Sequence, residues 1–198
     1  RGEREDLSGP AIREIVEKNG YEVVSADILP DDRKMLSERM AEIADSGAAE
    51  LILTRGGTGF SPRDITPEAT EDIIDRRVPG IPEAMRAYSM TITKRAMLSR
   101  STAGIRKKTL IINLPGSPKA VKESLEYIID ALEHGIEIMT GEAGGHLVLL
   151  ALRLGGDGHR VTGLGEGDGL QLDHHTLVQG ADEAIHLGVQ AGGILALA

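Results

Sequence analysis

The chain has 198 residues, 40% of them hydrophobic, so it can bury the core of a globular domain without disulfides or a structural metal. The absence of cysteine excludes a disulfide framework, a cysteine zinc site and a thiol nucleophile. A net charge of −9 argues against a nucleic-acid-binding protein, and no apolar run is long enough to suggest a membrane span.

Residues 1–145 alternate between helix-period and strand-like segments. Helices are predicted over 7–18, from Asp31 or Asp32 to about Ser46, from a cap at Thr66, over 81–90, and from 118 to about 132. Apolar runs predict strands over 21–29, 50–54 and 109–113, of the kind buried in parallel sheets. This order predicts an α/β fold, whose ligands bind at the carboxyl ends of the strands.

Residues 146–198 differ in composition and are predicted to form a separate extension. They hold five of the six histidines and 11 of the 25 glycines, but no lysine, proline or aromatic residue. A strand is predicted over 147–154 and a short helix over 182–189, whereas the glycine-rich region between them has no clear period. His159 and the pair His174-His175 lie beside aspartates, but such residues in a glycine-rich segment more often bind metal adventitiously or not at all.

Two glycine-bearing loops directly follow predicted buried strands. The first is 56–59 and the second is 114–118, which leads into a predicted helix capped by Ser117. Glycines let several backbone N–H groups approach one anion, and a helix N-terminus favours phosphate. Each loop alone could be an ordinary strand-to-helix turn; together they favour a ligand that carries phosphate.

Two carboxylates are placed to serve the same site. Asp64 lies five residues beyond Gly59, and Asp31 follows the strand over 21–29, so both are expected at one edge of the sheet. A carboxylate beside a phosphate normally needs a metal, and one or two carboxylates with phosphate oxygens are typical of Mg²⁺. A helix cap is the alternative for Asp31. Arg86, Arg100 and Lys119 could pair with phosphates or be solvated surface charges.

Residues 56–70 resemble the signature of the molybdopterin-binding family of molybdenum cofactor biosynthesis. The similarity begins at 4–10 and covers about residues 1–140. It continues through residues 79–80, 83, 85–86, 98–100, 103–105 and 114–119. The resemblance implies a three-layer α/β sandwich with a mostly parallel central sheet, which forms a homotrimer in the cytoplasm.

The resemblance also implies an activity, the adenylylation of molybdopterin by Mg-ATP with release of pyrophosphate. Carried over by motif, Asp31 and Asp64 would be the catalytic and Mg²⁺-binding carboxylates. The residues that would bind ATP or molybdopterin are Gly56, Gly57, Thr58, Gly59, Ser61, Thr66, Glu83, Arg86, Ser99, Arg100, Pro115, Gly116, Ser117 and Lys119. Ser99, Arg100 and the loop 115–117 would line the pterin side.

Two features depart from the family pattern. Arg55 stands before the glycine loop where the family commonly has threonine, and no strand precedes Arg1, although the family's first strand is expected near the sheet centre. Residues 147–154 could fill the gap, but truncation is the expectation, because a central parallel strand is hard to replace from the other end of the chain. A catalytically silent pterin-binding or assembly homologue is therefore kept as the alternative to the enzyme. A trimeric scaffold is a third possibility that no residue specifically supports.

Overall fold

The computed structural model describes residues 8–141, 147–153 and 194–196. These residues form seven strands and six helical segments. The strands are β1 (Glu22–Leu29), β2 (Leu51–Arg55), β3 (Arg76–Arg77), β4 (Ala103–Arg106), β5 (Thr109–Leu114), β6 (Leu147–Arg153) and β7 (Ile194–Ala196). The helices are α1 (Ser8–Lys18), α2 (Arg33–Ser46), α3 (Thr66–Glu71), α4 (Gly80–Met90), the 3₁₀ helix η1 (Lys94–Leu98) and α5 (Pro118–Thr140).

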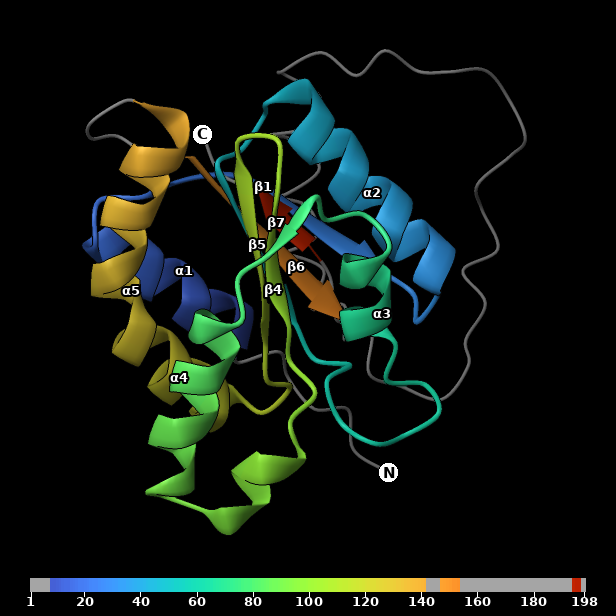
Figure 1. Cartoon of the computed structure of the whole chain (residues 1–198), viewed down its shortest axis with the longest axis vertical. Helices are drawn as coiled ribbons and strands as arrows, with labels where there is room; N and C mark the ends of the chain where they lie inside the picture. Colours follow the sequence, from blue (N-terminus) through green and yellow to red (C-terminus); the bar gives the residue numbers. More distant parts are fainter. Residues whose placement is uncertain (1–7, 142–146, 154–193, 197–198) are drawn as a thin grey trace.

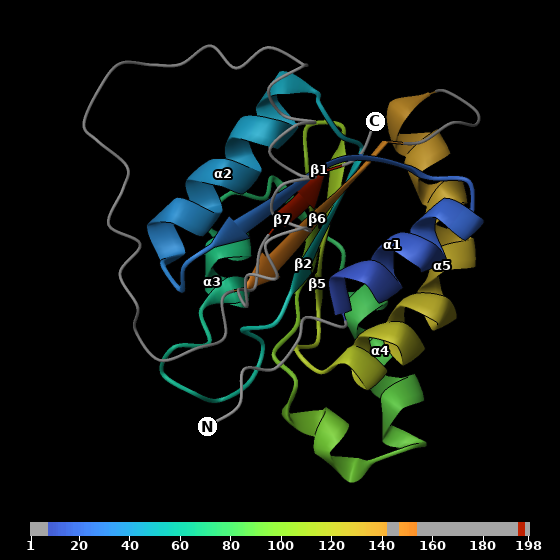
Figure 2. The same cartoon turned by 180° about the vertical axis from the view of Figure 1, so that it is seen from behind.

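The strands form one mixed sheet in the order β1-β7-β6-β2-β5-β4-β3, with β1 also paired to β6. Strands β1, β6, β2 and β5 run parallel to their neighbours in this series, whereas β3, β4 and β7 pair antiparallel. Helices α1, α4 and α5 cover one face of the sheet, and α2 and α3 cover the other (Figures 1 and 2). The predicted three-layer α/β sandwich is confirmed.

The alternation of side chains along the central strands divides the core into two layers. Leu51 and Leu53 pack with the buried faces of α1 and α5, while Ile52 between them packs with α2 on the opposite face. All three side chains are completely buried. Apolar residues on both faces of β2 explain why this strand reads as an unbroken hydrophobic run.

Asp32, and not the adjacent Asp31, caps the N-terminus of α2. The Asp32 carboxylate accepts a hydrogen bond of 2.9 Å from Met35 N at the start of α2, so Asp32 is the cap. The helix ends at Gly47, whose φ of 71° lies in the left-handed region that glycine adopts without strain. The cap alternative for Asp31 is therefore removed.

Two predicted helix boundaries are wrong. Ile65, not Thr66, occupies the cap position of α3, and Thr66 is already the first helical residue. Helix α5 continues to Thr140 instead of ending near Leu132. The interior Gly135 weakened the sequence signal, but Ile136 is completely buried and the contacts of this last part of α5 outweigh the low helix propensity of glycine.

Strand β6 lies inside the sheet, which is the alternative that the sequence left open for residues 147–154 but did not favour. It pairs parallel with β1 on one side and with β2 on the other, so it lies between the two strands that precede and follow α2. Truncation was expected to leave this position empty; in the structure a strand from the predicted extension occupies it. The predicted helix over 182–189 and the tail histidines lie outside the described residues.

The sequence also did not predict η1 or the antiparallel strands β3 and β4 at the edge of the sheet. Strands β4 and β5 form a hairpin with a two-residue turn, since Arg106 pairs with Thr109. The predicted elements skipped residues 91–106, where no clear period marks η1 or the short β4. None of the helices that the structure describes is long and apolar enough to cross a membrane.

Candidate functional site

The carboxyl ends of the parallel strands bring the predicted site segments to one edge of the sheet. Strands β2 and β5 pair in register from Leu51 with Leu110 to Arg55 with Leu114, so the loops after them lie side by side. Strand β1 runs in the same direction, separated from β2 by β6, and is followed by Asp31. Neighbouring strands are about 4.8 Å apart, so this arrangement places Asp31 and both loops at the same edge.

The glycine loop 56–59 requires its first two glycines. Gly56 and Gly57 have φ angles of 81° and 68°, a region in which side chains are strained. The Gly56 amide donates to Leu114 O at 3.1 Å, and the Gly57 carbonyl accepts from Thr66 N at 3.3 Å. The loop is therefore fastened to the end of β5 and to the start of α3.

The second loop touches the first and leads into α5. A Cβ on Gly116 would lie 3.5 Å from Gly56 Cα, which shows how closely the two loops approach. Arg55, the departure from the family pattern, donates from Nε to Gly116 O at 3.4 Å and so spans both loops. Ser117 accepts from Ala120 N at 3.2 Å and caps α5, as predicted.

Asp64 closes a small turn beside the glycine loop. Its Oδ2 accepts from Ser61 N at 2.8 Å, and its own amide donates to Ser61 O at 2.8 Å. The same Oδ2 would lie 2.9 Å from a Cβ on Gly59, so the carboxylate packs against that glycine. The carboxylate position is thus fixed both by the turn and by the absence of a side chain at residue 59.

The two site arginines bond to different parts of the chain. Arg86 on α4 donates to Ser101 O at 3.0 Å and to Ser99 O at 3.5 Å. The Arg100 guanidinium instead donates to Gly59 O at 2.7 Å, to Asp64 O and to the Glu68 carboxylate. Both arginine side chains therefore donate hydrogen bonds to other groups of the protein.

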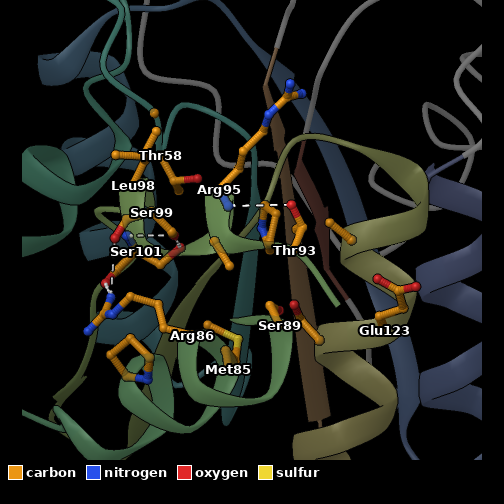
Figure 3. A pocket seen from close by; sticks show the side chains of 16 residues that line it. Thr58, Met85, Arg86, Ser89, Thr93, Arg95, Leu98, Ser99, Ser101 and Glu123 are labelled. Atoms are coloured by element: carbon orange, nitrogen blue, oxygen red, sulfur yellow. Dashed lines mark hydrogen bonds between the residues drawn. The ribbon is translucent and has the colours of Figure 1, made fainter. Parts of the chain in front are cut away.

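A cavity of about 300 Å³ lies between the two loops, α4, η1 and α5 (Figure 3). It contains five of the predicted site residues, namely Thr58, Gly59, Arg86, Ser99 and Pro115. The sequence reasoning missed the remainder of its polar lining, which consists of Ser89, Thr93, Arg95, Ser101, Glu123 and Ser124. Arg95 lies in η1, which the sequence did not predict. Residues 120, 123 and 124 lie on one face of the helix that was predicted from 118 to about 132, so helical spacing was the available signal for them.

The other predicted site residues lie at varied positions. Glu83 is exposed in the first turn of α4, and Lys119 is exposed on α5 with its Nζ 3.7 Å from the Glu123 carboxylate. Ser61 belongs to the turn that Asp64 closes. Thr66 is 2% exposed, and its hydroxyl has no hydrogen-bond partner among the described residues.

A buried amide that the sequence reasoning overlooked connects the elements beneath the loops. Asn113, completely buried in β5, donates from Nδ2 to the Thr54 and Thr70 hydroxyls, each at 2.8 Å. Its Oδ1 accepts from Thr102 N at 3.3 Å. This one side chain ties β2, α3 and the start of β4 together, just before the second loop. The polar residue in an otherwise apolar strand was the available signal.

Asp31 and Asp64 are the carboxylates that the sequence predicted for Mg²⁺. Within the described ranges, no group of three or more histidine, cysteine, aspartate or glutamate residues could hold a metal ion. Mg²⁺ bound through one or two carboxylates and substrate phosphates needs no such cage. Asp31 and Asp64 supply hard carboxylate oxygens of the kind that Mg²⁺ prefers.

Comparisons with known proteins identify the family of the chain. A family model described as "Probable molybdopterin binding domain" matches residues 1–134. A molybdopterin adenylyltransferase of Helicobacter pylori is 41% identical over 144 residues, which are 71% of this chain and 81% of that protein. A molybdopterin adenylyltransferase of Escherichia coli is 43% identical over 113 residues, 55% of this chain and 58% of that protein.

Solved structures of molybdopterin biosynthesis proteins are also similar to this chain. The molybdopterin biosynthesis enzyme MoaB of Thermus thermophilus has 46% identity and a TM-score of 0.67, covering 72% of this chain and 90% of that one. The molybdopterin biosynthesis Mog protein of Mycobacterium ulcerans has 34% identity and a TM-score of 0.65, with 69% and 88% covered. The site motifs, the fold and these matches together show that the chain belongs to the molybdopterin-binding domain family.

Proposed function

We propose that this protein transfers AMP from ATP to the phosphate of molybdopterin, in the biosynthesis of molybdenum cofactor. One observation carries the proposal: Thr58 and Gly59 of the glycine loop and Pro115 of the loop before α5 line a single cavity, and the Asp64 carboxylate packs against that same Gly59. Relatives named molybdopterin adenylyltransferase, at 41% and 43% identity, favour an active enzyme over the silent homologue.

The reaction needs no side-chain nucleophile. A phosphate oxygen of molybdopterin attacks the α-phosphorus of ATP, and the bond from that phosphorus to the oxygen bridging to the β-phosphate breaks. The electron pair leaves with pyrophosphate. The protein then contributes position and charge stabilisation, which dominate reactions of this kind.

The backbone of the two loops is suited to the phosphates. Gly56 and Gly57 let the chain turn tightly beside the N-terminus of α5, where the helix dipole favours negative charge. Asp31 and Asp64 would hold Mg²⁺ that arrives with the nucleotide. When bound, this ion would neutralise charge on the phosphate oxygens. The homotrimer and the cytoplasmic location are proposed from the family resemblance.

The cavity is suited to the pterin. Pro82, Met85 and Leu98 supply apolar walls for a flat ring, and hydroxyl groups surround them. Glu123 reaches from α5 into this lining (Figure 3). A carboxylate there could accept hydrogen bonds from the amino and ring N–H groups of a pterin. The Ser124 hydroxyl, which is buried and has no partner among the described residues, provides a second polar contact.

The experiment measures pyrophosphate release from ATP with and without molybdopterin. We expect release to require both molybdopterin and Mg²⁺, and Asp64→Asn to reduce it to a small residual rate while the protein remains folded. Asp72→Asn is the matched control, because that carboxylate pairs with Arg33 on the surface instead of the glycine loop. Binding of both substrates without turnover would identify the silent homologue. Unchanged release by Asp64→Asn would contradict the catalytic role of Asp64.

A further inference from the structure

Arg100 is placed to hold the glycine loop rather than the substrate. Its backbone amide donates to Thr58 O at 2.9 Å, and its Nε donates to Gly59 O at 2.7 Å. One terminal nitrogen of the guanidinium donates to the backbone carbonyl of Asp64, and the other contacts the Glu68 carboxylate. A single residue therefore fastens both ends of segment 59–64.

This attachment fixes the Asp64 carboxylate from behind. The carbonyl of Asp64 is held by Arg100, while its carboxylate turns back to Ser61 N at 2.8 Å. Gly59, the other anchor of Arg100, is the residue against which Asp64 Oδ2 packs. A shift of the guanidinium would therefore move both the carboxylate and the surface on which it rests.

Glu68 keeps the guanidinium in this orientation. It lies in the first turn of α3, and its Oε1 accepts from Arg100. Its second oxygen, Oε2, is buried and has no hydrogen-bond partner among the described residues. A carboxylate with one buried, unpartnered oxygen depends strongly on its remaining partner, because an unpaired charge in such a place is costly.

Arg100 differs in its surroundings from Arg86 and Arg95, two other arginines near the cavity. Arg86 and Arg95 line the cavity, whereas Arg100 is not among the lining residues and its side chain donates to three acceptors of the protein around segment 59–68. Its side chain is 33% exposed. We propose that Arg100 is a positioning residue that sets the place of the Asp64 carboxylate, in place of the ligand-binding role expected from the sequence. The proposal rests on the proposed function.

The test compares Arg100→Met and Arg100→Lys with the wild-type chain in pyrophosphate release. A displacement of about 1 Å can lower a rate roughly 100-fold, so we expect kcat to fall by about 10- to 100-fold. The Mg²⁺ concentration for half-maximal rate should rise several-fold, and the KM for molybdopterin should change less than about twofold. Lysine should restore little, because one ammonium group cannot reach three separated acceptors.

Two further variants keep the test decisive. Arg77→Met removes another arginine that pairs with a glutamate, Glu71, and should leave all three kinetic quantities unchanged. Glu68→Gln leaves Arg100 in the chain and weakens only its orientation, so it should give a smaller loss of the same kind even if Arg100→Met fails to fold.

Hydrogen exchange without any ligand supplies a readout independent of activity. The amides of Ser61 and Asp64 are both hydrogen-bonded within the turn, and both should exchange faster in Arg100→Lys and Glu68→Gln. Unchanged exchange of these amides would overturn the proposal. A KM for molybdopterin raised tenfold at unchanged kcat and Mg²⁺ dependence would overturn it too. If the wild-type chain releases no pyrophosphate, the proposed function fails, and the exchange result still decides the role of Arg100.

Discussion

Gly59→Ala is expected to slow the reaction by moving one carboxylate while leaving the backbone in place. The φ angle of Gly59 is not in the left-handed region, so alanine can adopt it. The added Cβ would lie 2.9 Å from Asp64 Oδ2, and ordinary contact begins near 3.4 Å, so the carboxylate must retreat by about 0.5 Å. If 1 Å costs roughly 100-fold, half of that distance should lower kcat about tenfold.

The assay is the initial rate of pyrophosphate release at saturating ATP and molybdopterin. Gly80→Ala is the matched control, since a Cβ there meets nothing within 4 Å, and its rate should equal that of the wild-type chain. Thermal unfolding of both variants checks that each is folded. An unchanged rate in Gly59→Ala would refute the claim that the position of Asp64 matters.

A double-mutant cycle tests the cause. If alanine at 59 acts through the Asp64 carboxylate, it should change the residual rate of Asp64→Asn by less than about twofold, because the amide of that variant no longer carries the negative charge whose position matters. Effects that multiply would refute this reasoning. They would place the action of Gly59 in the approach of its backbone to the ligand instead.

Three predictions concern the stability of the fold. Asn113→Ala should lower the free energy of unfolding in chemical denaturation by about 1–3 kcal/mol, because the buried Thr54 and Thr70 hydroxyls lose their amide donor and the half-buried Thr102 N–H loses its acceptor; no loss would contradict the linking role of Asn113. Gly104→Ala should cost about 1–3 kcal/mol in the same measurement, because its Cβ would lie 2.5 Å from Ile74 Cδ1 and 2.8 Å from Ile74 Cβ; a neutral variant would show that β4 can shift freely. The Arg106 and Lys107 side chains lower the pKa of Asp45 to about 2, so its ionised form stabilises the fold above its unfolded pKa, and this contribution is lost as the pH falls through about 2. Asp45→Asn should therefore be less stable than the wild-type chain at pH 6, and the difference should shrink between pH 4 and pH 2; a constant difference would refute the assignment.

The sequence predicted the elements whose signals are local. Ser117 and Pro118 marked the start of α5, and apolar runs marked β2 and β5, because capping and burial leave direct traces in residue type. The motif at 56–70 also identified the family correctly. Boundaries failed where a local signal was weaker than the tertiary contacts, as at Gly135 within α5.

The sequence could not predict which groups each arginine side chain contacts in the folded chain. Arg86 and Arg100 read as equivalent cations, but one lines the cavity beside Ser101 while the other holds the Asp64 turn. A guanidinium binds a carbonyl or a phosphate with the same donors, so residue type cannot distinguish the two uses. Only the positions of the acceptors can.

The amino-acid sequence by itself determined the class of this protein, through the order of its segments, its glycine loops and the motif at 56–70. Those features follow from local chemistry, which each segment carries independently of the others. The tertiary structure decided that β6 lies between β1 and β2, that Asp32 rather than Asp31 caps α2, and that Glu123 and Ser124 face the cavity. These relations depend on strand pairing and side-chain packing between distant segments, which no single segment encodes.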